Sequence, residues 1–311
     1  MISNLVDQVQ AVERAIAPDI DKMIDNFLIK TTTRDRLNYY PSLFTSRYWC
    51  KRQHVIHKLF FESNGFHYSE TNKVSGRIFG MGNLVHKYLQ DDVFSGDVRF
   101  LGKWQCVACK DKDVETIIGT NDNFVSKPDS GCPKCGYNLW EYAEVRAVNT
   151  ELNWSGRIDG IIEHARKRYL LDIKTKDSAA FANMIEPEYG YVQQLQCYME
   201  ATGIHQAILF YVEKNRLKSK TYIIHYDPTS LAKLYESTIH EVNDKLAKGK
   251  IPRRHSWCTK GSWMEQGCIY GAWGLDTCRG PRNLKTMTVK VQATPLHEDM
   301  NTRIIEGDRD V

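Results

Sequence analysis

The chain has 311 residues, 42% of them hydrophobic, so it is long enough for one large domain or two modest ones with ample core. The net charge of +4 is mildly basic, which permits a polyanionic partner without requiring one. The longest apolar run, Ala207 to Val212, is far too short to span a bilayer. The N-terminus lacks a signal-peptide pattern, and nine cysteines suit metal binding in a reducing compartment, so we expect no membrane association and a cytoplasmic location.

The first part of the chain has helical patterns. Residues 1–62 are expected to be mostly helical, with a break near Pro41 and a second helix starting at Cys50. Residues 75–90 follow as a glycine-punctuated approach to a short helix that carries His86. Residues 101–138 are polar, show no sustained period and contain two CxxC pairs, so we expect an inserted zinc-knuckle module there.

From residue 139 the pattern changes to strands. We predict strands and helices over 139–148, 152–164 and 167–175 (strands), 188–202 (helix), 206–214 and 221–227 (strands), and 228–248 (helix). This order predicts an α/β core with a central mixed sheet flanked by helices. We therefore expect a helical N-terminal part, the insertion, the α/β core, a Cys/Trp-rich segment and a polar tail at residues 1–100, 101–138, 139–250, 251–284 and 285–311.

Charged residues interrupt an apolar strand in the segment LLDIKTK, residues 170–176. Strand side chains alternate, so Asp172 and Lys174 share one face. Asp159, in GRIDGII, is separated from Asp172 by 12 residues, which suits a hairpin that brings the two carboxylates together. Two such carboxylates repel unless a cation lies between them, and Mg²⁺ or Mn²⁺ prefers this ligand environment. The plain alternative is a strand-edge ion pair of Asp172 with Lys174, with Asp159 capping a turn.

These segments resemble a known nuclease superfamily. GRIDG followed by LLDIKTK resembles the core of the PD-(D/E)XK (restriction-endonuclease-like) nucleases, in particular the RecB-like branch that includes the CRISPR-associated adaptation exonucleases. That branch has a later helix with Q-x-x-x-Y, which Gln194 and Tyr198 supply, and an upstream G-x-x-x-H-x-x-L, which Gly82, His86 and Leu89 supply. The resemblance covers about residues 45 to 280, apart from the insertion.

The resemblance implies roles for these residues. The Mg²⁺ or Mn²⁺ ligands would be His86, Asp159, Asp172 and the Ile173 carbonyl. Lys174 would be the catalytic lysine, acting with the two aspartates on a metal-bound water or on the phosphate. Gln194 and Tyr198 would hold the substrate strand or position the lysine.

His86 and Glu144 have plainer interpretations. Taken alone, His86 would be an ordinary helix histidine. Glu144 would be either a second-metal carboxylate or a solvent-facing strand residue.

The two CxxC pairs predict a structural zinc site. CVAC and CPKCG are separated by 22 residues, and Gly136 after the second pair suits the tight turn of a knuckle. The spacing is slightly longer than that of the usual zinc ribbon, so a chance pairing is the alternative. The expected ligands are Cys106, Cys109, Cys132 and Cys135.

Four of the other cysteines resemble the iron–sulfur set of certain RecB-like nucleases and AddB-type proteins. In those families one early cysteine joins three late ones, and the counterparts here are Cys50, Cys258, Cys268 and Cys278. The resemblance implies a 4Fe–4S cluster. The late spacing departs from the family pattern, since nine residues separate each neighbouring pair, so a second zinc site or plain buried thiols stay open. Cys197, inside a helix, is expected to be an ordinary side chain.

The resemblance implies a metal-dependent DNA exonuclease that acts on ends, often of single-stranded DNA. Basic and aromatic residues interleave in RRHSWCTKGSWM, so Arg253, Arg254 and Trp257 are candidates for phosphate and base contacts. A surface loop that packs its own tryptophans is the alternative. Rival functions are a structure-specific endonuclease of the same fold, or a catalytically idle DNA-binding subunit of a recombination or repair complex with a helicase partner. The chain has no P-loop, so a motor would have to come from such a partner.

Overall fold

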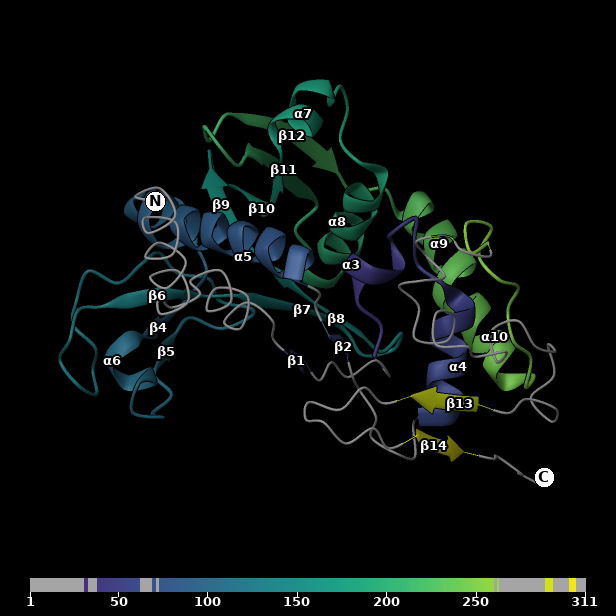
Figure 1. The fold of residues 1–311 in the computed structure, drawn as a ribbon. Helices are drawn as coiled ribbons and strands as arrows, with labels where there is room; N and C mark the ends of the chain where they lie inside the picture. Colours follow the sequence, from purple (N-terminus) through teal and green to yellow (C-terminus); the bar gives the residue numbers. More distant parts are fainter. Residues whose placement is uncertain are drawn as a thin grey trace, which may run out of the picture.

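The computed structural model describes residues 31–32, 38–61, 69–70, 73–259, 262, 289–292 and 302–305. Its centre is a five-stranded sheet in the order β12–β11–β10–β9–β3, with β10 and β11 parallel and the other neighbours antiparallel. The sheet is therefore mixed, and its helical flanks give the α/β architecture expected from the sequence (Figure 1). The bounds of its strands are β3 Phe100–Leu101, β9 Gly160–His164, β10 Lys167–Lys176, β11 Gln206–Glu213 and β12 Ser219–His225.

Helices precede the sheet, follow it and connect its strands. The bounds are α3 Pro41–Phe44, α4 Lys51–Phe61, α5 Lys73–Tyr88, η1 Leu89–Val93, η2 Phe94–Gly96, α6 Val107–Lys110, α7 Ser178–Asn183, α8 Tyr189–Thr202, α9 Pro228–Tyr235, η3 Glu236–His240 and α10 Glu241–Ala247. The elements η1 and η3 are π-helical turns, and η2 is a 3₁₀ turn.

Helices α5 and α8 cover opposite faces of the central sheet. Leu170 of β10 packs in one cluster with Leu195 of α8, whereas Leu171 packs in a second cluster with Val85 of α5. Successive strand residues point to opposite faces, so the two clusters lie on the two sides of β10. Asp172, two residues after Leu170, therefore faces α8.

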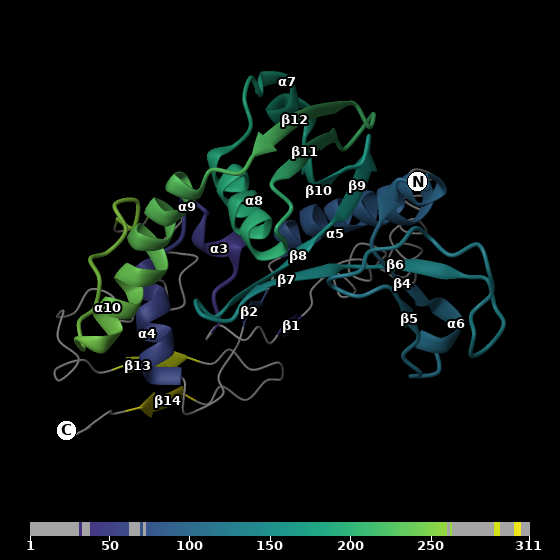
Figure 2. The ribbon, with the colours of Figure 1, turned by 180° about the vertical axis from the view of Figure 1, so that it is seen from behind.

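Smaller sheets extend the fold on either side. A three-stranded sheet β5–β4–β6 lies across the molecule from α9 and α10, and a hairpin of β7 and β8 runs next to α8 between them (Figure 2). Two further pairs join β1 with β2 and β13 with β14. The bounds are β1 Thr31–Thr32, β2 Ser69–Glu70, β4 Lys103–Cys106, β5 Ile117–Ile118, β6 Trp140–Ala143, β7 Val145–Asn149, β8 Trp154–Ile158, β13 Val289–Gln292 and β14 Thr302–Ile305.

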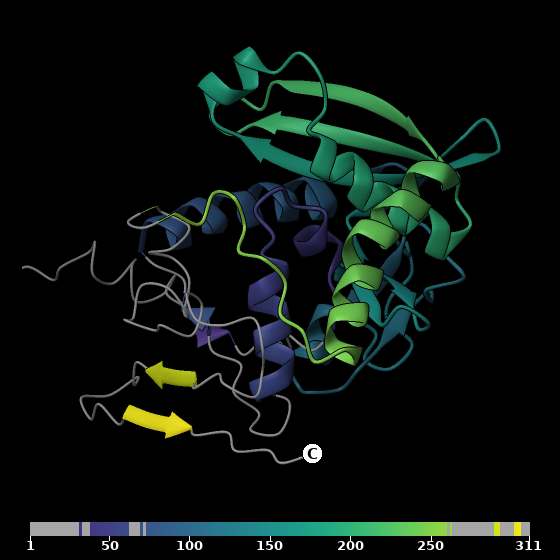
Figure 3. The same ribbon diagram turned by 90° about the vertical axis from the view of Figure 1, so that its right-hand side faces the viewer.

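The long helix predicted over residues 228–248 is confirmed. Asp227 caps it, since its side chain accepts hydrogen bonds from the backbone N–H groups of Thr229 and Ser230, and Pro228 occupies the first turn. The π-turn η3 joins α9 to α10, and α10 packs beside α4 (Figure 3). No helix in the described part of the chain combines the length and apolar character needed to cross a bilayer.

The structure corrects three predicted elements. The strand predicted over 139–148 is two strands, because β6 pairs with β4 whereas β7 pairs with β8. The strand predicted over 152–164 also divides, at Asp159, into β8 and β9 of different sheets. The glycine-rich approach to His86 is itself helical, since α5 begins at Lys73. A Cβ at Gly82 would lie 3.3 Å from Thr175 Oγ1, so its glycine allows α5 close to β10.

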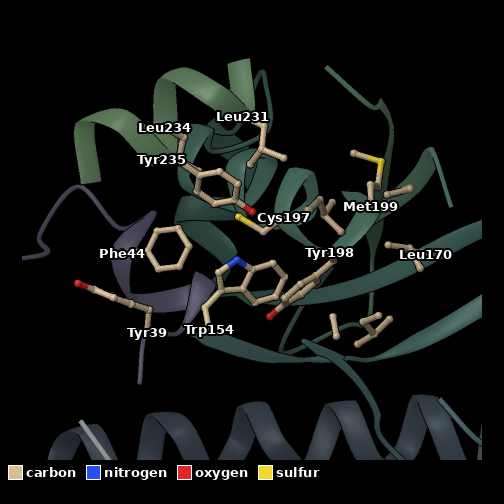
Figure 4. Packing of buried hydrophobic residues seen from close by; sticks show 14 of the residues in the cluster. Tyr39, Phe44, Trp154, Leu170, Cys197, Tyr198, Met199, Leu231, Leu234 and Tyr235 are labelled. Carbon is tan, nitrogen blue, oxygen red and sulfur yellow. The ribbon is translucent and has the colours of Figure 1, made fainter. Parts of the chain in front are cut away.

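Aromatic packing holds α8 against β8. The rings of Trp154 and Tyr198 lie side by side, with centroids 6.4 Å apart (Figure 4). A Cβ at Gly156 would lie 2.3 Å from the Tyr198 ring, so only glycine leaves room for that ring beside β8. The Tyr198 ring is therefore confined between β8 and the helix that carries it.

Candidate active site and metal centres

The β9–β10 hairpin brings the two predicted aspartates together. Gly160 lies opposite Leu171 in the β9–β10 ladder. The next residue on each strand is an aspartate, so Asp159 and Asp172 lie next to each other at the end of the ladder. Asp159 Oδ2 accepts a 2.7 Å hydrogen bond from the Ile173 backbone N–H, between the two carboxylates. The Asp159 carbonyl accepts a 2.7 Å bond from Gln90 Nε2 of η1. Asp159 is thus held from β10 and from the end of α5.

His86 of α5 contacts the same carboxylate. Its Nδ1 lies 3.4 Å from Asp159 Oδ1. Burial lowers the pKa of His86, but the hydrogen bond and the charge of Asp159 outweigh it, so the pKa is raised above its ordinary value. Burial raises the pKa of Asp159, yet the bonds from His86 and Ile173 and the charge of Lys174 bring it below its ordinary value. The contact between His86 and Asp159 therefore favours the ionised form of the Asp159 carboxylate and the protonated form of the His86 imidazole.

Asp172 and Lys174 form a buried ion pair on the α8 face of β10. Lys174 Nζ lies 2.9 Å from Asp172 Oδ1 and 2.8 Å from Oδ2, and only 3% of the Asp172 side chain is exposed. Burial and the neighbouring charge of Asp159 raise the pKa of Asp172 to about 6, against the opposing charge of Lys174. Burial lowers the pKa of Lys174, but the charges of both aspartates prevail and raise it. The ring of Tyr191 lies 4.8 Å below the same ammonium.

Gln194 and Tyr198 lie behind this pair. Gln194 Nε2 is 3.5 Å from Asp172 Oδ1 and 2.9 Å from the Tyr198 hydroxyl. Gln194 is 4% exposed and Tyr198 2%, so neither presents a surface to a substrate strand. Of the two roles that the resemblance implies, the geometry favours positioning of the Asp172–Lys174 pair over contact with the substrate.

The donor set suits a divalent cation. One imidazole and two carboxylates lie in this part of the molecule, and the buried Asp172 Oδ2 has the Lys174 ammonium at 2.8 Å but no hydrogen bond of good geometry from the described residues. Hard oxygen ligands of this kind suit Mg²⁺ or Mn²⁺. The three side chains do not bring their ligand atoms within 4.8 Å of one another; among the described residues only a cysteine group does so.

That cysteine group is the predicted zinc quartet. Cys106 Sγ lies 3.5 Å from Cys135 Sγ, and Cys109 Sγ lies 3.7 Å from Cys132 Sγ. Zinc–thiolate bonds of about 2.3 Å in a tetrahedron place sulfur atoms about 3.8 Å apart. The four cysteines therefore fit a closed structural metal site, as their spacing predicted.

The second CxxC pair has the backbone of a metal knuckle. Gly136 has φ +78°, and its N–H donates to the Cys132 carbonyl at 2.8 Å. The Lys134 N–H donates to Cys132 Sγ at 3.4 Å. A Cβ at Gly131 would lie 2.4 Å from the Gly136 carbonyl, so the turn requires glycine on both sides.

The cysteine module shares its core with the central fold. Trp104 of β4 is fully buried, and its ring lies 6.0 Å from Phe100 of β3 and 5.6 Å from Tyr142 of β6. Val85 of α5 and Leu171 of β10 belong to the same cluster. The module's sheet also includes β6, which lies past the predicted boundary at residue 138. Its division from the core as a separate domain stays a prediction.

The remaining cysteine set is described in part. Burial raises the pKa of the Cys50 thiol, and Cys258 lies close enough for its charge to raise it further. The segments that carry these two cysteines lie side by side, since His255 Nε2 contacts the Arg47 carbonyl at 3.0 Å. Cys268 and Cys278 lie outside the described residues, so the set of four stays a prediction.

The predicted basic and aromatic contacts lie beside these two cysteines. Trp257 is 43% exposed, with its ring centroid 5.1 Å from that of Tyr48 and the Arg47 guanidinium 5.2 Å from it. Arg253 is exposed, whereas Arg254 donates to the Cys258 carbonyl. The structure thus leaves Arg253 and Trp257 accessible and gives Arg254 a structural contact.

Sequence reasoning missed two residues and left a third open. Gln90 and Tyr191 contact Asp159 and Lys174, although neither belongs to a motif. The signal for Tyr191 was its place three residues before Gln194, on the same face of a helix. Glu144 pairs with Arg157 at 2.9 Å and is exposed at 37%, which favours the solvent-facing alternative.

Comparisons with known proteins give no family. No protein-family profile and no curated protein matches the chain. Three solved structures that do match are a crystal structure of SSO0001 (16% identity, 68% of this chain, 79% of that chain, TM-score 0.36) and the alkaline exonuclease LHK-Exo from Laribacter hongkongensis, alone and in complex with dAMP (18%, 31%, 50%, 0.27 each). The chain covers only half of LHK-Exo. Similarity this low carries no argument, so the PD-(D/E)XK assignment stays a prediction.

We predict about one zinc ion per chain, held by the cysteine quartet. Replacing Cys132 with serine should remove the metal, because three thiolates leave the tetrahedron incomplete. The measurement is elemental analysis of protein purified without chelator. Cys197→Ala, at a cysteine buried in α8, is the matched control and should retain zinc. Zinc-free wild-type protein would contradict the site.

Proposed function

We propose that the protein is a Mg²⁺- or Mn²⁺-dependent DNA nuclease, most simply an exonuclease acting on single-stranded ends. The observation that carries the proposal is the convergence of Asp159, Asp172 and Lys174 with His86 at the β9–β10 hairpin. The strand with Asp172 is followed by the helix with Gln194 and Tyr198, in the order that the PD-(D/E)XK resemblance implies.

The residues divide the chemistry between them. His86, Asp159, Asp172 and the Ile173 carbonyl would hold the cation, which when bound polarises the phosphodiester and lowers the pKa of a bound water. Lys174 Nζ, 2.8 Å from Asp172, orients the attacking water or neutralises charge that develops on the phosphate. The Tyr191 ring packs against the Lys174 ammonium from one side, so the position of Lys174 does not depend on the Asp172 carboxylate alone.

Two rival functions keep the same fold. A structure-specific endonuclease would use the same residues, and only the products distinguish it from an exonuclease. A catalytically idle DNA-binding subunit of a recombination or repair complex, with a helicase as partner, would not need a lysine paired with one buried aspartate beside a second one. Burying an ion pair costs desolvation that an apolar pair in the same place would not, so the presence of these charges favours an enzyme.

Asp172→Ala and Lys174→Ala should each lower the hydrolysis rate by about 10²-fold or more, since each removes a ligand or a proton-handling group. The assay uses end-labelled single- and double-stranded DNA with and without Mn²⁺. Lys167→Ala, an exposed lysine at the far end of β10, is the control and should retain activity. Full activity of either site variant would overturn the nuclease proposal.

The variant Tyr198→Phe tests whether Tyr198 positions the Asp172–Lys174 pair or contacts the substrate. The change removes the hydroxyl that Gln194 contacts and keeps the ring packed on Trp154. We expect a lower kcat, by roughly 3- to 10-fold for the loss of one hydrogen bond of about 1 kcal/mol, with KM for DNA little changed. A purely structural role would lower thermal stability without this split between kcat and KM. A raised KM with unchanged kcat would instead assign substrate contact.

We further propose a structural zinc in the cysteine quartet and a 4Fe–4S cluster on Cys50, Cys258, Cys268 and Cys278. The packing of the segment that carries Cys258 against the segment that carries Cys50 supports the second site, since Trp257 packs on Tyr48 and His255 contacts the Arg47 carbonyl. The exposed Arg253 and Trp257 beside it suit a DNA strand. A cytoplasmic location would suit both metals and the free thiols.

Protein purified without oxygen should be brown and contain about four iron and four sulfide ions per chain. Cys258→Ala should lose both and become more sensitive to protease near residue 258, while its zinc content stays unchanged. Absorbance, iron and sulfide analysis and limited proteolysis provide the readout. Colourless, iron-free wild-type protein that is nevertheless stable and active would show that these cysteines hold no cluster.

A further inference from the structure

A groove of about 610 Å³ opens beside the candidate metal edge, between α5, the cysteine module and the β7–β8 hairpin. His86 and Gln90, which contact Asp159, form part of one wall. Lys103 of β4 and Arg146 of β7 lie on the module and hairpin sides. The groove therefore reaches the candidate metal edge at His86.

The carboxylates of the groove are already engaged. Glu141 pairs with Lys110, and Glu144 pairs with Arg157 at 2.9 Å. Asp91 accepts a 2.7 Å hydrogen bond from the Tyr142 backbone N–H. The lining cations outnumber these three carboxylates, so positive charge is left over; the cations are Lys87, Lys103, Lys110, Arg146 and Arg157.

The excess positive charge of the groove is concentrated on Lys103 and Arg146. Neither has an ion-pair partner within the part of the chain that the structure describes. Lys103 lies opposite Ala143 in the β4–β6 ladder, three residues before Arg146, and both side chains line the groove, so the two cations are near each other. Burial lowers the pKa of Lys103, and the charge of Arg146 lowers it further, against the opposing charge of Glu115. Arg146 also lies directly opposite Arg157 across the β7–β8 ladder. Like charges in that position are unfavourable, and an anion bound beside Arg146 would relieve the repulsion that the Arg157–Glu144 pair leaves.

We propose that this groove binds the phosphodiester backbone of a single DNA strand, with Lys103 and Arg146 holding phosphates next to the metal edge. The substrate class rests on the proposed nuclease function, whereas the binding itself does not. A volume of about 610 Å³ is that of a small-ligand site and fits a short segment of one strand. The lining is mostly charged or amide side chains, which favours phosphate contact over base stacking.

Binding of a strand in this groove would give the cysteine module a part in placing the substrate. Lys103 precedes Cys106 by three residues on β4, and β4 pairs with β6 next to Arg146 of β7. A metal in the quartet fixes the end of β4 and thereby one wall of the groove. The module would then act as a substrate-positioning element rather than only as a stabiliser.

The test measures binding of a fluorescent oligothymidylate by anisotropy over a range of salt concentrations, without added divalent cation. The Asp172→Asn background prevents cleavage. The double variant Lys103→Ala/Arg146→Ala should weaken binding roughly 10-fold and reduce the slope of log K against log salt by about 1.4, for two lost contacts. Arg146→Lys should recover most of the affinity because it keeps the charge, whereas Arg146→Glu should weaken binding further.

Lys218→Ala/Lys233→Ala is the matched control, since both lysines are exposed and neither lines the groove. It should bind like the parent, and zinc content and thermal melting should show that all variants are folded. Equal binding by the parent and the groove variant would overturn the proposal, as would absence of binding by the parent or preference for an acidic peptide over DNA. If the nuclease assay fails while these binding effects are observed, the proposed nuclease function is wrong, but the proposal that the groove binds DNA still holds.

Discussion

Burial of charge at the β9–β10 hairpin is the constraint on which much of the structure depends. Asp172 is removed from water, Asp159 and Lys174 are largely so, and an unpaired buried charge costs about 3–5 kcal/mol when its partner is lost. Each partner comes from a different element: His86 from α5, Lys174 from β10 and Gln194 from α8. Satisfying these charges therefore fixes both flanking helices against the sheet.

Packing supports the same arrangement from behind. Gly156 leaves the space that the Tyr198 ring occupies, and Trp154 closes its side. The Tyr198 hydroxyl can then meet Gln194, which meets Asp172. A small residue in β8 thus influences the carboxylate through three contacts, and a larger side chain there would displace α8 rather than the aspartate directly.

The sequence was most informative where short-range geometry decides the outcome. Strand alternation and the hairpin spacing placed Asp159, Asp172 and Lys174 together, and helical periodicity placed Gln194 with Tyr198. The CxxC quartet was also predictable, because its ligand spacing is local. Long-range features were not: the glycines of α5 gave no sign that Thr175 lies against Gly82, and nothing local to Trp104 shows that it packs on Phe100 and Tyr142. The partners in these cases are chosen by the assembled fold.

The π-turn η1 shows how the two halves of the candidate site are joined. It begins at the residue that follows α5, and such turns are rare and frequently lie at functional sites. Within it, Gln90 donates to the Asp159 carbonyl of the central fold, while Asp91 accepts from Tyr142 of the cysteine module's sheet. Two adjacent residues thereby bind two different sheets. Because His86 lies one turn earlier on the same helix, order that a metal would impose on the module would be transmitted through Asp91 to the element that carries the imidazole.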